Sequence, residues 1–374
     1  MASTPKANAP AKQLIFLLGK RDAPADGVQD YCEYLGQALR RRDFAVEIAR
    51  VDGVSEGWVN ALWKLWNVSR DWRGRWVVLQ YTALGWSRRG FPVGAVAALA
   101  IADRRGARCA VVFHEPFGLS GSRAIDRVRG ACQNWVIRKL HGQSERSIFP
   151  APLPTIAWLS KGDPKAASVP IGANIPERPT RPETELPRVN KERSIVIFCL
   201  SGMPILREEL DDISRATSVA KEKGAEFRLT FIGRGTKEAS EEISRTLENI
   251  PIEFSNLGLV PAEEVCAALT GADAMLCVRG RVYPRRGSAI AGIACGLPII
   301  GYAGEAENTP IADAGLVLVP YRDGAALGTA LARVLKDRTL LSELQEKSLR
   351  AYKRHFSWDS IAAKVAEFLG AEPK

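Results

Sequence analysis

The chain has 374 residues and a net charge of +10, with 46% apolar and 25% charged residues, which suits a globular protein of two average-sized domains. It has no charge-free run of 18 apolar residues, no Cys-x-x-Cys pair among its seven cysteines and no pair of neighbours among its three histidines. These features argue against a transmembrane helix, a disulfide framework and a zinc site, and we expect a cytosolic protein with reduced thiols and no secretory signal.

Short apolar runs alternate with helical patterns over the first half of the chain. Residues 1–12 are small, polar and basic, and we expect a disordered tail there. The expected strands are 13–18, 45–49, 76–81 and 110–113, and the helical patterns between them are 28–39, 59–66, 93–102 and 125–140. Strands that alternate with helices predict a parallel sheet covered on both faces, here an N-terminal lobe at 13–180.

The same pattern restarts after a segment with no periodicity. Residues 175–193 hold four prolines and many charges, and we place a linker at 181–193. The expected strands are then 194–200, 227–232, 252–254, 274–278 and 298–301, and the helices 211–223, 237–247, 262–269, 287–295, 325–336 and 340–354. We therefore expect a second α/β lobe at 194–354, followed by a final helical segment within 355–374. Open α/β sheets bind ligands beyond the carboxyl ends of their strands, so the expected site is a cleft between the two sheets.

The loop before the helix at 287–295 has the composition of an anion site. A helix begins with free N–H groups and the positive end of its dipole. Gly287 lets the backbone approach a ligand closely, and Ser288 could cap the helix and donate its hydroxyl. Arg285 and Arg286 add forked donors. This combination predicts a diphosphate site. The alternative interpretation of the loop is an ordinary capped helix start with incidental arginines.

Residues 285–301 resemble the donor-site helix of the retaining glycosyltransferases of family four, which adopt the GT-B fold of two facing Rossmann-like lobes. The family's Ala-(Cys/His)-Gly-Leu-Pro-Val-Val is matched by Ala-Cys-Gly-Leu-Pro-Ile-Ile at 294–300. Five further fragments follow the family in order along nearly the whole chain, at 27–35, 113–116, 169–176, 231–235 and 356–358. The resemblance implies that the final helix crosses back to the first lobe.

The chain departs from the family in two places. Many members carry two glutamates eight positions apart in the donor loop, and those positions hold Tyr283 and Ala291 here. The chain is similar to a branch with Arg-Arg-Gly-Ser in this loop instead. After the first strand of the second lobe, the family often shows Gly-Arg and then a Lys. Here Gly202 is followed by a methionine, and the basic residue five positions after Gly202 is Arg207.

The resemblance implies transfer of a hexosyl group from a nucleoside-diphosphate sugar to a glycan or lipid-linked acceptor, with retention and with no metal or other cofactor. The diphosphate contacts would come from Gly27, Gly202, Arg207, Arg285, Arg286, Gly287 and Ser288. Cations and N–H groups arranged in advance stabilise the charge that grows on the leaving diphosphate. The resemblance places His114 beside the reacting sugar, and Glu115 is a second catalytic candidate. A structural hydrogen bond is the alternative for His114.

Two other classes of protein share the alternation of strands and helices. A nicotinamide-dependent oxidoreductase should show Gly-x-Gly-x-x-Gly after its first strand, and neither residues 19–27 nor 233–235 fit. A GT-B binding or scaffold protein that has lost transfer remains open because the paired glutamates are absent.

The positive charge is concentrated in the first half. Residues 1–180 hold 26 basic and 15 acidic residues, whereas the remainder holds 26 and 27, and eight of the nine tryptophans also lie in residues 1–180. This combination suits an anionic membrane surface, with basic pairs at 40–42, 88–89 and 104–105, or a phosphorylated acceptor. No nucleic-acid-binding signature accompanies it. The alternative is that the basic residues are spread around the lobe and only aid solubility.

Overall fold

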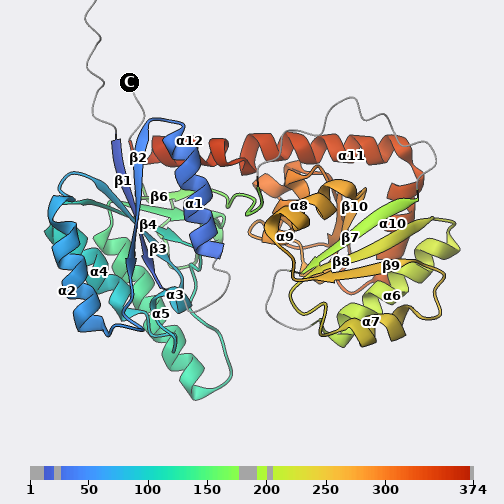
Figure 1. Cartoon of the computed structure of the whole chain (residues 1–374), viewed down its shortest axis with the longest axis horizontal. Coiled ribbons are helices and arrows are strands. Elements are labelled where there is room, and N and C mark those ends of the chain that lie inside the picture. Colours follow the sequence, from blue (N-terminus) through green and yellow to red (C-terminus); the bar gives the residue numbers. More distant parts are fainter. Residues whose placement is uncertain (1–11, 21–26, 177–191, 200–204, 371–374) are drawn as a thin grey trace, which may run out of the picture. The chain divides into compact units, whose positions relative to one another are not determined.

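The computed structural model describes residues 12–20, 27–176, 192–199 and 205–370, and its contacts divide the chain into two compact units (Figure 1). The first unit runs to Pro170 and takes in the chain again from Trp358, and the second is Ile171–Ser357. The second unit begins ahead of the expected linker because Ala173 and Ile175 are buried in its core. Most of the expected linker and tail lies outside the described residues.

Six parallel strands form the sheet of the first unit, in the order β2-β1-β3-β4-β5-β6. They are β1 (Lys12–Gly19), β2 (Phe44–Val51), β3 (Trp76–Tyr81), β4 (Arg108–Phe113), β5 (Arg146–Phe149) and β6 (Ala166–Ser168). The two central strands are almost entirely apolar, which is the composition of strands covered on both faces. Because the strand order reverses between β1 and β3, the carboxyl ends of these strands are where a ligand site is expected.

Helices cover both faces of this sheet. On one face, α1 (Gly27–Arg40) packs with α12 (Trp358–Phe368), which confirms that the last helix returns to the first lobe. On the other face lie α2 (Trp58–Val68), α4 (Val93–Arg104) and α5 (Ala124–Gln143), with α4 in contact with both neighbours. Shorter elements are η1 (Ser69–Asp71), α3 (Ala83–Trp86) and η2 (Leu153–Thr155).

The second unit has a six-stranded parallel sheet in the order β12-β11-β10-β7-β8-β9. Numbered along the unit and taken from the other edge, this is the Rossmann order 3-2-1-4-5-6. The strands are β7 (Arg193–Cys199), β8 (Phe227–Gly233), β9 (Phe254–Gly258), β10 (Ala274–Arg281), β11 (Ile299–Tyr302) and β12 (Leu316–Val319). The order reverses between β7 and β10, so the loops after these two strands flank the expected ligand site.

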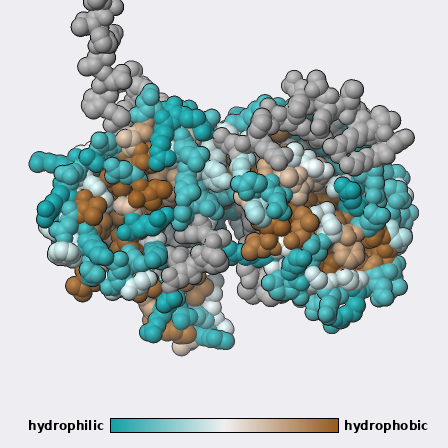
Figure 2. Space-filling view, viewed as in Figure 1, coloured by the Kyte–Doolittle hydropathy of each residue, from teal (hydrophilic) through white to brown (hydrophobic). Residues whose placement is uncertain are grey.

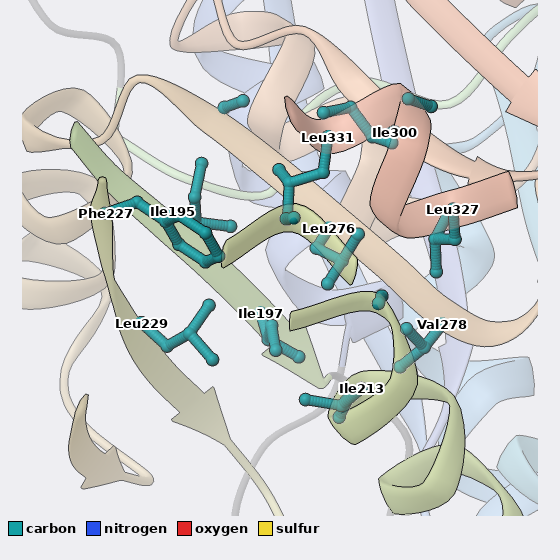
Figure 3. Packing of buried hydrophobic residues seen from close by; sticks show 14 of the residues in the cluster. Ile195, Ile197, Ile213, Phe227, Leu229, Leu276, Val278, Ile300, Leu327 and Leu331 are labelled. Atoms are coloured by element: carbon teal, nitrogen blue, oxygen red, sulfur yellow. The ribbon is translucent and has the colours of Figure 1, made fainter. Parts of the chain in front are cut away.

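The second sheet is also covered on both faces. One face carries α6 (Arg207–Glu222), α7 (Ser240–Leu247), α10 (Gly324–Lys336) and the first part of α11 (Arg338–Ala351), whose last residue packs in the core of the opposite face. Figure 3 shows this packing, with leucines of α10 and Ile213 of α6 against alternate residues of β7, β8 and β10. The opposite face carries α8 (Ala262–Gly271), α9 (Gly287–Ala294), η3 (Pro310–Asp313) and the π-helical η4 (Tyr352–Phe356).

The predicted fold class is confirmed as two Rossmann-like α/β units. The elements that the sequence did not indicate are short, namely α3, β5, β6 and β12. The strand expected at 252–254 begins two residues later, at Phe254, and its side chains are mostly exposed, so its apolar pattern is weak.

Candidate functional site

The site of the second unit is built at the carboxyl ends of β7 and β10. The turn after β8 closes against the end of β7, where the Arg234 N–H donates to the Cys199 carbonyl at 3.1 Å. A Cβ at Gly233 would lie 1.9 Å from that carbonyl oxygen, and its φ is 111°. Only glycine fits this approach, which explains the Gly-Arg-Gly turn recognised in the sequence.

Arg286 is the central charged residue of the loop between β10 and α9. Its side chain is 91% buried, and its Nη1 donates to the Arg281 carbonyl at 3.0 Å. Its Nε has no hydrogen-bond partner among the described residues. A buried guanidinium donor without a partner is costly, and an anion is the ligand that such a donor fits.

Gly287 and Ser288 begin α9 directly after Arg286, with the helix dipole and its free N–H groups at this end. The expected capping role of Ser288 is wrong. Arg286 is the N-cap residue, with no side-chain cap hydrogen bond, and Ser288 is the second helical residue and is buried. Because Ser288 is already helical, its backbone N–H is one of the donors that the helix leaves free.

Arg279, at the end of β10, is neutralised by an ion pair that the sequence did not reveal. Its Nε and Nη2 donate to the carboxylate of Glu209 in the first turn of α6, at 3.0–3.2 Å. Burial raises the pKa of the nearby Cys199 thiol to about 11, and the charges of Arg279, Glu209 and Arg286 also act on it. Arg279, Glu209 and Arg286 therefore each lie near enough to act on Cys199, the last residue of β7.

Arg207 is the first residue of α6, and its side chain is exposed. Because α6 and α9 follow the two strands at the switch point, the amino ends of both helices lie at the carboxyl edge of the sheet. Gly202 lies outside the described residues. Arg285 is half-buried in the turn before Arg286. At the positions of the missing glutamates, Tyr283 is exposed and Ala291 is buried in the core.

In the first unit, His114 directly follows β4. Its Nε2 lies 2.9 Å from Oε1 of Gln80, whose Nε2 donates to the Val78 carbonyl at 3.3 Å. This orientation of Gln80 requires the Nε2 of His114 to carry the proton. Burial lowers the pKa of His114 to about 4, so the imidazole is neutral near pH 7.

His114 also lies against α1, whose Tyr31 ring meets it edge-on with 4.9 Å between the ring centroids. Gly27 is the first residue of the same helix, so the first unit brings His114 close to the amino end that contains Gly27. The carboxylate of Glu115, the residue after His114, accepts from the Ala83 N–H at 2.9 Å, at the start of α3.

The candidate residues thus form two groups. His114, Glu115 and Gly27 belong to the first unit, and Arg207, Arg285, Arg286, Gly287 and Ser288 belong to the second. Among the described residues, no group of three or more His, Cys, Asp and Glu side chains is placed to hold a metal ion. No helix in the described parts of the chain has both the length and the apolar composition to cross a membrane.

Comparison with known proteins defines the fold class. No protein-family model and no curated protein matches the chain. Among solved structures, it is similar to a glycosyltransferase from Rickettsia africae ESF-5, with 13% identity, a TM-score of 0.66 and coverage of 96% of this chain and 99% of that one. It is also similar to Anabaena Alr3699/HepE in complex with UDP and glucose, with 13% identity, a TM-score of 0.64 and coverage of 96% and 100%.

A third similar structure is a putative UDP-N-acetylglucosamine 2-epimerase from Listeria monocytogenes, with 12% identity, a TM-score of 0.59 and coverage of 97% and 99%. The chain therefore has the GT-B fold, as the sequence predicted. Because that fold carries both transferases and epimerases, the chemistry has to be argued from the site itself.

Proposed function

We propose that the chain is a glycosyltransferase that moves a hexosyl group from a nucleoside-diphosphate sugar to a glycan or lipid-linked acceptor, with retention at the anomeric carbon and without a metal ion. The observation that carries this proposal is the buried Arg286, whose Nε lacks a partner at the amino end of α9. The Rickettsia and Anabaena structures support it, because they are a glycosyltransferase and a protein that binds UDP and glucose.

The leaving diphosphate gains negative charge as its bond to the sugar breaks. Arg286, the first N–H groups of α9 and the exposed Arg207 would stabilise that charge from fixed positions. Arg279 is not counted with them, because Glu209 already balances its charge. These cationic and N–H groups would do the work that a bound divalent cation does in metal-dependent transferases.

The sugar carbon gains positive charge in the same step. A neutral His114 does not repel that charge, whereas an imidazolium would. Gln80 holds the proton of the ring on Nε2. We assign His114 to the reacting sugar because the resembled family places it there, and Glu115, which bonds the Ala83 N–H, stays the second catalytic candidate.

The second candidate function is nucleotide-sugar binding without transfer. It is favoured by Tyr283 and Ala291, which stand where many members of the resembled family hold the donor with glutamates. Under this alternative, Arg286 would still bind a diphosphate.

The test is incubation of the purified full chain with UDP- and GDP-hexoses, with and without EDTA, with the products followed by NMR. We expect slow release of nucleoside diphosphate that EDTA does not reduce, with a released sugar that first appears in the anomeric configuration of the donor. Inversion or loss of activity in EDTA would overturn the proposed mechanism. Binding of the sugar nucleotide with no release of nucleoside diphosphate would favour the second candidate function. Formation of an epimerised sugar nucleotide would contradict both functions and identify an epimerase.

A further inference from the structure

The outward side of α2 is apolar, although this helix lies at the surface of the first unit. Ala61 and Leu65 face the core, while Val59 and Trp63 are 87% and 64% exposed. Trp66 continues the stripe one turn later and is also exposed. Spacings of four and three residues place these side chains on one side of the helix, away from the sheet.

The two neighbouring helices continue this surface. On α4, Val93 is exposed, and the positions that follow it on the outward side are alanines and then Arg104. On α5, Val128 and Trp135 are 56% and 53% exposed, whereas Val136 and Leu140 are buried. Since α4 contacts both α2 and α5, the three outward sides adjoin, and we call them together the helical face. Its large exposed members are Val59, Trp63, Trp66, Val93, Val128 and Trp135.

The helical face is also the basic side of the unit. Residues 58–71, 93–105 and 124–143 contain eight basic and three acidic residues. The helices on the opposite side of the sheet, 27–40 and 358–368, contain two basic and four acidic residues. The positive charge of the first half is therefore not spread evenly around the unit, and it accompanies the exposed tryptophans.

Arginine and tryptophan are in direct contact on this face. The Arg105 guanidinium lies 3.6 Å from the centroid of the Trp66 ring, and its Nη2 donates to the Trp66 carbonyl at 2.6 Å. Arg138 and Lys139 follow Trp135 within one helical turn, and both are exposed. Indole rings with adjacent cations suit the boundary between lipid headgroups and acyl chains, where rings are half-buried and cations meet phosphates.

We propose that the helical face binds an anionic lipid bilayer, with Trp63 and Trp135 at headgroup depth and the basic residues against phosphate groups. The proposal does not rest on sugar transfer, since it concerns a surface other than the site at the strand ends. The basic group at 40–42 does not take part. It lies at the carboxyl end of α1, on the opposite side of the sheet, where Arg40 donates to the Val46 carbonyl and Arg41 pairs with Asp359.

The test is co-sedimentation of the full chain with vesicles of phosphatidylcholine, with and without phosphatidylglycerol. We expect binding only to vesicles that contain phosphatidylglycerol, at about 0.1 M salt, and release at about 1 M salt because the Debye length shortens from about 10 to about 3 Å. Trp63→Glu should weaken binding by about tenfold or more, since it removes a ring that the bilayer would bury and adds a negative charge that the anionic lipid repels. Its control is Leu259→Glu, the same kind of change at a 69% exposed position of the second unit.

A charge-reversal pair separates the face from overall net charge. Arg138→Glu with Lys139→Glu should weaken binding more than Arg245→Glu with Lys347→Glu, which changes the net charge equally on exposed sites of the second unit. Equal losses would overturn the proposal, as would failure of the wild type to bind the anionic vesicles. If the wild type instead forms dimers that Trp63→Glu dissociates, the helical face is an interface between two copies and the proposal is wrong.

Discussion

At the scale of single residues, the half-buried Arg279 and the buried Arg286, at and after the end of β10, have opposite surroundings. Arg279 has a carboxylate partner in Glu209, whereas Arg286 is bonded only through Nη1 to a backbone carbonyl and keeps its Nε unpartnered among the described residues. The sequence shows both as members of one arginine-rich loop. Only the fold shows that the charge of one is balanced, so that the anion site is expected at the other.

The first residue-scale prediction concerns Glu209→Gln. This change removes the carboxylate charge opposite Arg279 in a mostly buried place, and the loss should be about 2–3 kcal/mol of unfolding free energy, measured in urea. The control is Glu241→Gln, in an exposed pair with Arg245, which should cost less than about 0.5 kcal/mol. Equal losses in the two variants would show that the buried pair is not a stabilising contact.

The second prediction concerns the turnover of the sugar nucleotide. His114→Ala should reduce the rate constant of sugar transfer or donor hydrolysis by about 100-fold, the lower range for a group that acts on the transition state. Affinity for the diphosphate should stay within a few fold, since the phosphate groups belong to the second unit. The control is His355→Ala, whose ring bonds Asp313 and not the site. A parent-like rate in His114→Ala would return the residue to a structural role.

The third prediction concerns how the free energy of unfolding depends on pH. The pKa of His114 is lowered from 6.5 to about 4 in the folded chain, so between these values the unfolded chain binds a proton that the folded chain does not. Stability must therefore fall as the pH falls from about 6.5 to about 4, and His114→Gln should reduce that loss. Urea unfolding of both proteins at several pH values measures it, and equal slopes would contradict the lowered pKa.

At the scale of elements, α12 completes the core of a unit that lies more than 180 residues before it. Trp358 is 1% exposed, stacks on Tyr34 and meets Tyr31 edge-on. Tyr31 is also the residue of α1 that contacts His114. The last helix thus supports the helix against which the candidate catalytic histidine lies.

The element-scale prediction is that Trp358→Ala destabilises the first unit by about 3–5 kcal/mol, the usual cost of removing a buried tryptophan. Calorimetry should show the loss in the transition of the first unit, with the second unchanged, because the two units have separate cores. Trp63→Ala serves as the control at an exposed position and should change stability by less than about 0.5 kcal/mol. A uniform shift of all transitions would contradict separate cores.

The elements that the sequence predicted are those with a strong apolar pattern. Buried strands such as β3 and β4 and amphipathic helices such as α6 leave a clear periodic signal. β6 and β12 are sheet-edge strands of three and four residues without a fully buried side chain, so their pairing depends on neighbours and not on their own sequence. The N-cap of α9 was missed for a related reason, since an arginine has no capping preference and tertiary contacts set the start of the helix.

At the scale of the whole molecule, each unit places its candidate residues at or just beyond the carboxyl ends of its parallel strands. Alternation of strands and helices predicts both sheets and therefore which loops flank a site. It cannot predict that Gln80 fixes the proton on His114 or that Glu209 neutralises Arg279, because these pairs join residues 34 and 70 positions apart in the sequence. The chain's resemblance to one transferase family supplied the roles, and the structure supplied the partners.

We expect the second unit to bind a nucleoside diphosphate through Arg286, and calorimetric titration of the full chain with UDP and GDP tests this claim. Arg286→Ala should weaken binding of the preferred nucleotide by about 10- to 100-fold, because a charge-assisted phosphate bond is worth about 1.5–3 kcal/mol. Arg245→Ala, at an exposed position of α7, should leave the affinity unchanged. Equal affinity in the parent and Arg286→Ala, or no binding of either nucleotide by the parent, would contradict the claim.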